Sequence, residues 1–573
     1  TNGFYLDGVG VTDQSGNNNN WTNNNLNLST STATTYDQMK DTPSLVDENA
    51  GNFCTLNPLD KYSSAVIAEG NLKIGANNNS WTNQARSTFF VSSGKWYWEV
   101  TLSPGTGTFW KAGIRDAAAA LTGNTTSSTG YEYYAYNGNK QATGVNSSYG
   151  SALTAGDVLA FALDMDAGTI TVYKNNTSLG VMFSGLSGSY SPTVSMYNSF
   201  ISLNFGQRPF AYTPPSGFLK LNTFNLPDST IEKGSDYFNT VPYTGTGVAN
   251  RAVTGVGFQP DFTWFKSRST TNAHNLTDAV RGAGFNLISS STSVEINESA
   301  YITGFISDGV QLGLVGGNTN TNNVSYVAWN WLASNTTATN SAGANGATIA
   351  STYSANTTSG FSVVSWSGNS TNGATVGHLL GAAPSLIITK CRSHATSWVV
   401  GIGGISGFGV NDYLTINNTS QKNASSTFYQ AYSANTFQVG VSSADEMNKT
   451  GRTYISYCFA EVPGYSAIGS YTGNGSADGT FVHLNFRPSW LLIKQTNGGS
   501  FNWNLIDTSR SPFNTADDLL APNANNAEVV SGFVDAVSNG FKCRNTSAYV
   551  NGSGSTYIYM AFAENPFKNS NAR

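Results

Sequence analysis

Short apolar runs rich in β-branched and aromatic residues alternate with polar turns along almost the whole chain. In residues 157–174, an apolar run is followed by the turn Asp166-Ala-Gly168 and then by alternating apolar and polar positions up to Lys174. This pattern predicts a buried strand, a tight hairpin turn in which glycine supplies a positive φ, and a half-buried partner strand. Helical periodicity is confined to two short candidates, residues 278–282 and 516–520. The pattern therefore predicts an all-β protein.

One strand pattern occurs three times in the C-terminal part of the chain. A proline is followed six residues later by a lysine, with an apolar run between them: Pro260 and Lys266, Pro384 and Lys390, Pro488 and Lys494. Later in each copy, a second run begins with tyrosine and ends with an aromatic residue: Tyr326 and Trp331, Tyr454 and Phe459, Tyr557 and Phe562. A module copied within one chain indicates an architectural role, and it favours reach, surface display or avidity over a single active site.

The three repeated lysines are open to two interpretations. They form a row that binds a ligand, or each ends a first or edge strand that proline opens, with its charge in solvent. Because lysine is rarely buried without a partner, we expect the second arrangement.

Composition narrows the class of protein. Charged residues are only 11% of the chain, aromatic residues are 12%, and there are 60 glycines, so the surface is polar but mostly neutral while material for cores is ample. The net charge of −5 and the lack of a basic run exclude nucleic-acid binding, and no apolar run is long enough to insert into a membrane. The four scattered cysteines predict buried free thiols rather than disulfides. An extracellular type of surface without disulfides or a signal peptide is typical of assembly in a host cytoplasm followed by release, as for a virus particle.

The chain is too long for one core, and turn-rich segments divide it. We expect an N-terminal arm packed on the next domain, a β-sandwich, and three β-rich repeat domains, the second of which begins with a polar linker. The predicted boundaries are residues 1–60, 61–222, 223–335, 336–466 and 467–573.

Three motifs in residues 61–222 carry a resemblance to a known family. They are Gly-Lys-Trp-Tyr-Trp-Glu-Val from Gly94, Gly-Asp-Val-Leu-Ala-Phe-Ala-Leu-Asp-Met-Asp-Ala-Gly-Thr-Ile-Thr-Val-Tyr-Lys from Gly156, and Asn-Phe-Gly-Gln-Arg-Pro-Phe from Asn204. Their order and spacing resemble a SPRY (B30.2) domain. The resemblance implies an antiparallel sandwich of two sheets, lectin-like in shape, that binds partners through loops at one rim.

Further motifs resemble the large structural proteins of tailed bacteriophages. They are Asp-Gln-Ser-Gly-Asn-Asn-Asn-Asn-Trp from Asp13 and Phe-Ala-Glu-Asn-Pro-Phe-Lys from Phe562. This resemblance implies a virion protein, a tail-fibre or spike subunit that attaches to a host-surface glycan or receptor, contacts other virion proteins, and is a homo-oligomer, typically a trimer. The alternatives are a head fibre, decoration or baseplate-type protein without a specific receptor and, less favoured, a polysaccharide depolymerase.

No constellation in the sequence supports catalysis, a metal or a cofactor. Glu461 and Glu564 are candidates for a pair of glycosidase acids, but the first repeat lacks the equivalent carboxylate. Asp164 and Asp166 flank a hairpin without further acidic ligands nearby, and Cys391 with His394 is not reproduced in the other repeats. We therefore expect a protein that is not an enzyme.

The best binding candidate is a run of tyrosines. Tyr131, Tyr133, Tyr134 and Tyr136, followed by Asn137, come after a Gly-, Ser- and Thr-rich loop at residues 121–130. On a strand, alternate side chains point to opposite faces, so one set should be in the core and the other exposed. Exposed aromatic rings beside amides are suited to sugars, because the CH face of a sugar stacks on the ring while its hydroxyls bond to amides.

Overall fold

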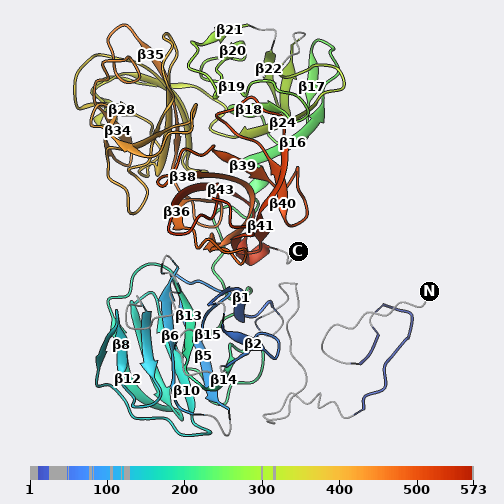
Figure 1. Ribbon diagram of the computed structural model, residues 1–573, viewed down its shortest axis with the longest axis vertical. Coiled ribbons are helices and arrows are strands. Elements are labelled where there is room, and N and C mark those ends of the chain that lie inside the picture. Colours follow the sequence, from blue (N-terminus) through green and yellow to red (C-terminus); the bar gives the residue numbers. More distant parts are fainter. Residues whose placement is uncertain are drawn as a thin grey trace. The chain divides into compact units, whose positions relative to one another are not determined.

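The computed structural model describes residues 11–13, 15–24, 48, 51–62, 64–75, 81, 83–103, 107–117, 119, 121, 130–298, 301–313 and 318–570. Within these ranges the protein is all-β: β-strands are joined by turns and three short 3-10 segments, Gly234–Asp236, Ala344–Gly346 and Phe567–Asn569. None of the described segments is a helix long and apolar enough to cross a membrane. The chain divides into two compact units, residues 1–228 and 229–571 (Figure 1).

The first unit contains two antiparallel sheets. One has the order β1 (Leu56–Lys61), β4 (Asn83–Ser87), β13 (Tyr190–Met196), β6 (Trp110–Asp116), β7 (Gly130–Tyr134), β8 (Lys140–Ala142) and β9 (Val145–Ser147). The other has the order β12 (Thr177–Ser184), β11 (Thr169–Lys174), β10 (Val158–Asp164), β5 (Lys95–Leu102), β14 (Phe200–Asn204), β3 (Lys73–Gly75) and β2 (Val66–Ala68), with β15 (Leu219–Lys220) parallel to β5.

The motif strands form the core of this sandwich. Trp96 and Trp98 on β5 are each 1% exposed, and Trp98 stacks on Phe161 of β10 with ring centroids 5.2 Å apart. The predicted hairpin is confirmed: β10 pairs with β11 across a turn in which Gly168 has φ of +63°. Leu56–Lys61, placed in the arm by its polar surroundings, forms the edge strand β1 of this unit.

The second unit is built from three repeats, each with two main sheets. Repeat 1 has β16 (Phe238–Thr244), β24 (Ser325–Trp331), β18 (Phe262–Ser267) and β19 (Asn275–Asp278), then β17 (Arg251–Val253), β23 (Gly309–Leu312) and β22 (Ile302–Ile306), and the pair β20 (Phe285–Asn286) and β21 (Ile296–Asn297). Repeat 2 has β25 (Ala338–Asn340), β26 (Ser351–Asn356), β27 (Phe361–Ser367), β35 (Thr453–Phe459), β29 (Leu386–Cys391), β30 (Val399–Gly401), β31 (Asp412–Thr415) and β32 (Asn423–Ala424), then β28 (Ala374–Gly377), β34 (Thr436–Val439) and β33 (Tyr429–Tyr432). Repeat 3 has β36 (Ser466–Thr472), β43 (Thr556–Pro566), β38 (Phe486–Gln495) and β39 (Asn504–Asp507), then β37 (Phe481–His483), β42 (Gly540–Cys543), β41 (Val529–Val537) and β40 (Ala516–Leu519).

The repeats are equivalent residue by residue. In each, a strand paired with the closing strand (β16, β27 or β36) carries an aromatic side chain that stacks on the tyrosine opening the closing strand. The centroid distances are 5.3, 4.4 and 5.0 Å for Tyr243–Tyr326, Trp366–Tyr454 and Tyr471–Tyr557. Two residues later each chain needs glycine, because a Cβ would lie 2.1, 2.3 and 2.4 Å from a backbone oxygen at Gly245, Gly368 and Gly473, respectively. The recurring Thr-Gly and Ser-Gly motifs are therefore explained by a close backbone approach.

The three repeats close on one another around a shared core. The last aromatic residues of the three closing strands, Trp331, Phe459 and Phe562, meet there with centroid distances of 6.4, 5.8 and 6.1 Å. Main-chain hydrogen bonds join the repeats in a cycle: Glu295 donates to Arg392 (2.9 Å), Lys422 to Thr496 (3.0 Å) and Glu528 to Arg268 (2.8 Å). The repeats, green, gold and red in Figure 1, thus form one closed body instead of an extended array.

The expected solvent exposure of the repeated lysines is wrong. Lys266, Lys390 and Lys494 are each 0% exposed, and burial lowers the pKa of each to about 8. Their ammonium groups donate to main-chain oxygens, and two of them do so across repeats: Lys390 to Thr292 (3.3 Å) and Lys494 to Thr419 (3.1 Å). Two of the three lysines thus reach a neighbouring repeat and none faces solvent, which the sequence of one repeat does not reveal.

Two further local predictions are settled. Neither helical candidate is helical: residue 278 ends β19, and Ala516–Leu519 is strand β40. The prediction of buried free thiols is confirmed for Cys54, Cys391, Cys458 and Cys543.

Candidate functional site

Strand β7 and the turn after it divide the predicted tyrosine run. Tyr133 is 0% exposed and donates to the Ser151 carbonyl (2.5 Å), and Tyr131 packs edge-on against Phe183. Tyr134 and Tyr136 lie elsewhere, in the cluster described next. Asn137 is exposed in the turn, where its side-chain oxygen accepts the N–H of Asn139 (3.0 Å).

Tyr134 and Tyr136 belong to a group of five aromatic side chains, which we call the aromatic platform. Its members are Trp81, Phe109, Tyr134, Tyr136 and Tyr197. Tyr136 is 49% exposed and Phe109 is 38% exposed, and they stack with centroids 4.3 Å apart. Large side chains stacked on each other yet open to solvent are unusual for packing alone and are typical of binding surfaces.

Contacts with Lys111 and with the loop between β13 and β14 support the platform. The Lys111 ammonium lies 4.7 Å from the Trp81 ring centroid and 5.2 Å from that of Tyr134, and it donates to Gln141 (2.5 Å). Burial lowers the pKa of Lys111. The Ser199 hydroxyl donates to the Gly107 carbonyl (2.8 Å), and Tyr197 N–H donates to the Phe109 carbonyl (2.9 Å). These contacts fix the Phe109 segment against the loop between β13 and β14, so the rings are preorganised.

The sequence analysis found two members of this platform and missed three. Trp81, Phe109 and Tyr197 come from other strands and loops, and only the folded sheet brings them beside β7. Most of the predicted rim loop, residues 122–129, lies outside the described residues.

The residues weighed for catalysis or metal binding have structural partners. Glu461 accepts the N–H of Ile468 (2.8 Å), whereas Glu564 pairs with Arg487. Asp164 forms an ion pair with Lys95 (2.7 Å), and His394 contributes a main-chain oxygen to Lys390. Across the described ranges, no group of three or more His, Cys, Asp or Glu side chains is arranged to hold a metal ion.

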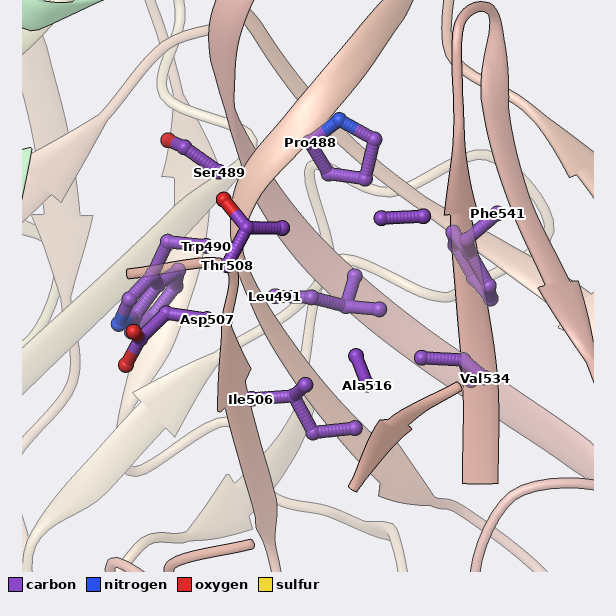
Figure 2. A pocket seen from close by; sticks show the side chains of 11 residues that line it. Pro488, Ser489, Trp490, Leu491, Ile506, Asp507, Thr508, Ala516, Val534 and Phe541 are labelled. Carbon is purple, nitrogen blue, oxygen red and sulfur yellow. The ribbon is translucent and has the colours of Figure 1, made fainter. Parts of the chain in front are cut away.

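An apolar pocket lies between the two sheets of repeat 3 (Figure 2). Leu491, Ile506, Ala516, Val534 and Phe541 surround it, and its volume is about 10 Å³. That is at most the space of one water molecule, and the lining offers little to bond it. We interpret it as a packing defect rather than a ligand site.

Comparison with known families assigns both units. A family model described as "Domain of unknown function (DUF7483)" matches residues 233–566, which is more than half of the chain and coincides with the three-repeat body. The chain belongs to the DUF7483 family. A second model, described as "SPRY domain", matches residues 95–208 in the sandwich, which confirms the resemblance of the motif strands. In this DUF7483 protein the aromatic platform therefore lies on the SPRY sandwich and its adjoining loops.

The SPRY region is similar to parts of much longer proteins. It is 31% identical over 151 residues to "E3 ubiquitin-protein ligase RKP" of Arabidopsis thaliana, covering 24% of this chain and 11% of that protein. It is 28% identical over 168 residues to "Ran-binding protein 10" of Danio rerio, covering 27% of this chain and 28% of that protein. Among solved structures, the SPRY domain of human HERC1 matches with 21% identity and a TM-score of 0.22, over 26% of this chain and 96% of that one. The chain spans less than a third of the curated relatives it matches.

Proposed function

We propose that this protein is a non-catalytic attachment protein of a virion, a fibre or spike subunit of a tailed phage, and that its SPRY sandwich binds a host-surface glycan. The observation that carries the binding role is the stacked and exposed Phe109–Tyr136 pair on a preorganised support. The neutral, polar composition and the free thiols suit a particle assembled in a host cytoplasm. In this proposal the subunit is a homo-oligomer, and weak single sites gain avidity from it.

Two alternatives stay within the proposal. As a head fibre, decoration or baseplate-type protein, the chain would keep the same structure without a specific receptor. The names of the SPRY relatives point instead to a protein ligand, since two of them are named for binding Ran. Exposed valines on the edge strands β9 and β12, Val145 (69%) and Val181 (52%), favour that second candidate. A protein ligand would contact this edge, whereas a glycan would occupy the platform.

The test is binding of the labelled full chain to candidate host cells and to a glycan array. We expect saturable binding that blocks phage adsorption, and about a tenfold loss of affinity in Tyr136→Ala and in Phe109→Ala, because the stacking surface for a sugar is removed. Phe513→Ala, which removes an 83% exposed aromatic side chain of the other unit, is the matched control and should bind normally.

Each other outcome has a meaning. Binding that survives both platform changes but is lost in Val145→Lys would favour a protein ligand. Absence of cell and glycan binding, with the protein present in purified particles, would favour the decoration role. Absence from particles would overturn the virion assignment.

A further inference from the structure

Repeat 2 contains a polar pocket of about 240 Å³ that none of the preceding roles uses. Its lining consists of Ser397, Val399, Tyr413, Thr415, Asn418, Ser420, Gln421, Asn423, Phe428 and Glu446. Val399 and Phe428 are buried, and Tyr413 packs edge-on against Phe428 with centroids 4.6 Å apart. The pocket thus combines an apolar floor with walls of hydroxyl and amide groups.

The equivalent positions in repeat 1 carry two side chains that bond to each other. Val399 and Tyr413 correspond to Asn275 and Asn286, because Val400 pairs with Leu414 just as Leu276 bridges Leu287. The Asn286 amide donates to the Asn275 side-chain oxygen (2.7 Å). In repeat 3 the corresponding Asn504 amide donates to the carbonyls of Asn502 (3.2 Å) and Tyr549 (3.1 Å). Val399 can form neither bond, so repeat 2 has lost the polar contact made here in its sister repeats.

The wall of the pocket is anchored by repeat 3. The Trp503 indole donates to the Thr415 carbonyl (2.9 Å), and the buried Lys494 donates to the Thr419 carbonyl (3.1 Å). On the pocket side, the Thr415 hydroxyl donates to Asn418 (2.5 Å), which also accepts the Ser420 N–H (2.9 Å). The loop is therefore held in place without a ligand, and a ligand would not have to order it.

Several polar groups in the lining are available to a ligand. Among the described residues, the side chains of Ser397, Tyr413 and Gln421 have no hydrogen-bond partner. Glu446 is the charged member of the lining, and it accepts the Ser442 hydroxyl. A carboxylate among neutral donors and acceptors disfavours anions and suits hydroxyl donors. The volume lies below the usual range of about 300–1,000 Å³ for drug-sized ligands, which limits the occupant to a small molecule or one ring.

We propose that this pocket binds one neutral pyranose ring of a glycan. The ring's CH face would pack on Tyr413 and Phe428, and its hydroxyls would bond Gln421, Ser397 and Glu446. The site is separate from the aromatic platform and does not depend on the function proposed above, because it lies in the other unit and uses different residues.

The proposal is tested by saturation-transfer NMR and calorimetry of the full chain with glucose, galactose, mannose and N-acetylglucosamine. We expect saturable binding of at least one sugar, and a loss of affinity of about tenfold in Gln421→Ala. The double variant Val399→Asn with Tyr413→Asn introduces the asparagine pair of repeat 1 and removes the Tyr413 ring on which the sugar would pack, so it should abolish this binding. Asn322→Ala changes an exposed amide of repeat 1 and is the matched control.

The readouts separate this site from the platform. Sugar binding that persists in Tyr136→Ala and disappears in the Val399→Asn, Tyr413→Asn double variant supports the pocket, whether or not the platform also binds a sugar. No saturable signal from any of the four sugars overturns the proposal. It is also overturned if the signal is unchanged in Gln421→Ala and in the double variant, with thermal unfolding showing that both variants are folded.

Discussion

Two of the three joints between the repeats are ionic, and the third is apolar. At the joint of repeats 1 and 2, Arg281 binds Asp278 (2.5 Å) and Glu295 (3.0 Å), Arg392 binds Glu295 (2.8 Å), and Tyr457 donates to Asp278 (2.9 Å). The joint of repeats 3 and 1 repeats this scheme with Arg510, Asp507, Glu528, Arg268 and Trp329. At the joint of repeats 2 and 3, the same positions hold Ile405, Ile402, Lys422, Thr496 and Met560.

The comparison shows that one backbone joint accepts two kinds of side-chain chemistry. The equivalence is read from spacing: Asp278, Ile402 and Asp507 follow His274, Trp398 and Trp503 by four residues each, and the arginines or Ile405 follow by seven. Ile402 and Ile405 are 0% and 2% exposed and belong to the shared core. Replacing a buried ionic group by apolar residues is often neutral or stabilising, provided that the whole set changes together. At the joint of repeats 2 and 3 the whole set differs in this way.

The largest effect is expected from breaking an ionic joint on one side. Asp507→Ala removes one of the two carboxylates that bind Arg510, whose side chain is 0% exposed, and also the acceptor of the Trp329 indole (2.9 Å). We expect the free energy of unfolding to fall by about 3–5 kcal/mol, because a buried arginine loses one of its two carboxylate partners and a buried indole loses its acceptor. Urea unfolding measures it, with Asp236→Ala at an exposed pair as the control. A loss below about 1 kcal/mol would contradict a structural role for this joint.

Truncation in the apolar joint should cost somewhat less. Ile405→Ala creates a cavity in the shared core and should lower the free energy of unfolding by about 2–4 kcal/mol, while Ile405→Val should cost about 0.5–1.5 kcal/mol. The double variant Ile402→Asp with Ile405→Arg lacks the partners of an ionic joint, so it should lower the free energy of unfolding more than Ile405→Ala or Ile405→Val does. Adding Lys422→Glu and Thr496→Arg to that double variant should recover part of the loss. If the added pair gives no recovery, the joints are not interchangeable.

The buried lysines predict a smaller dependence on alkaline pH. Burial lowers the pKa of Lys494 to about 8, below its value of about 10.4 in the unfolded chain, so the unfolded state binds more protons between these values. Stability should therefore rise as pH increases from about 8 to 9.5. Urea midpoints at several pH values measure this slope, which Lys494→Met should reduce and the exposed Lys233→Met should not. A flat profile in the wild type would contradict the lowered pKa of these lysines.

The smallest effect separates the joints at acid pH. Burial alone would raise the pKa of Glu295, but its hydrogen bonds and ion pairs with Arg392 and Arg281 outweigh burial, and the pKa is lowered. The pKa of Glu528 is lowered in the same way by Arg268 and Arg510. A lowered pKa contributes stability that is present above the unfolded value of about 4.3 and is lost as pH falls through the folded value. Glu295→Gln and Glu528→Gln should flatten stability below pH 5, whereas Thr496→Val, which changes no charge at the joint of repeats 2 and 3, should leave that acid limb unchanged. Identical acid limbs in all three variants would show that the ionic joints do not titrate as described.

Local sequence patterns are sufficient to predict the strands, the hairpin after β10, the SPRY sandwich, the repeats and the buried thiols. These features depend on alternation, turn chemistry and motif spacing, which are local. The sequence also indicates Tyr134 and Tyr136 as candidate binding residues, since alternation along this run separates them from the buried Tyr133.

The roles of the repeated positions depend on contacts between repeats, which exist only in the folded protein. Within the sequence of one repeat, the lysines at positions 266, 390 and 494 resemble surface residues. Yet Lys494 donates to an oxygen 75 positions away, in another repeat, and Lys390 to one 98 positions away. Trp81, Phe109 and Tyr197 reach the platform from separate segments of the chain. Val399 and Tyr413 line the pocket in repeat 2 and lack the side-chain hydrogen bond that their counterparts form in repeat 1. Such contacts join residues far apart in the chain, and no local pattern records them.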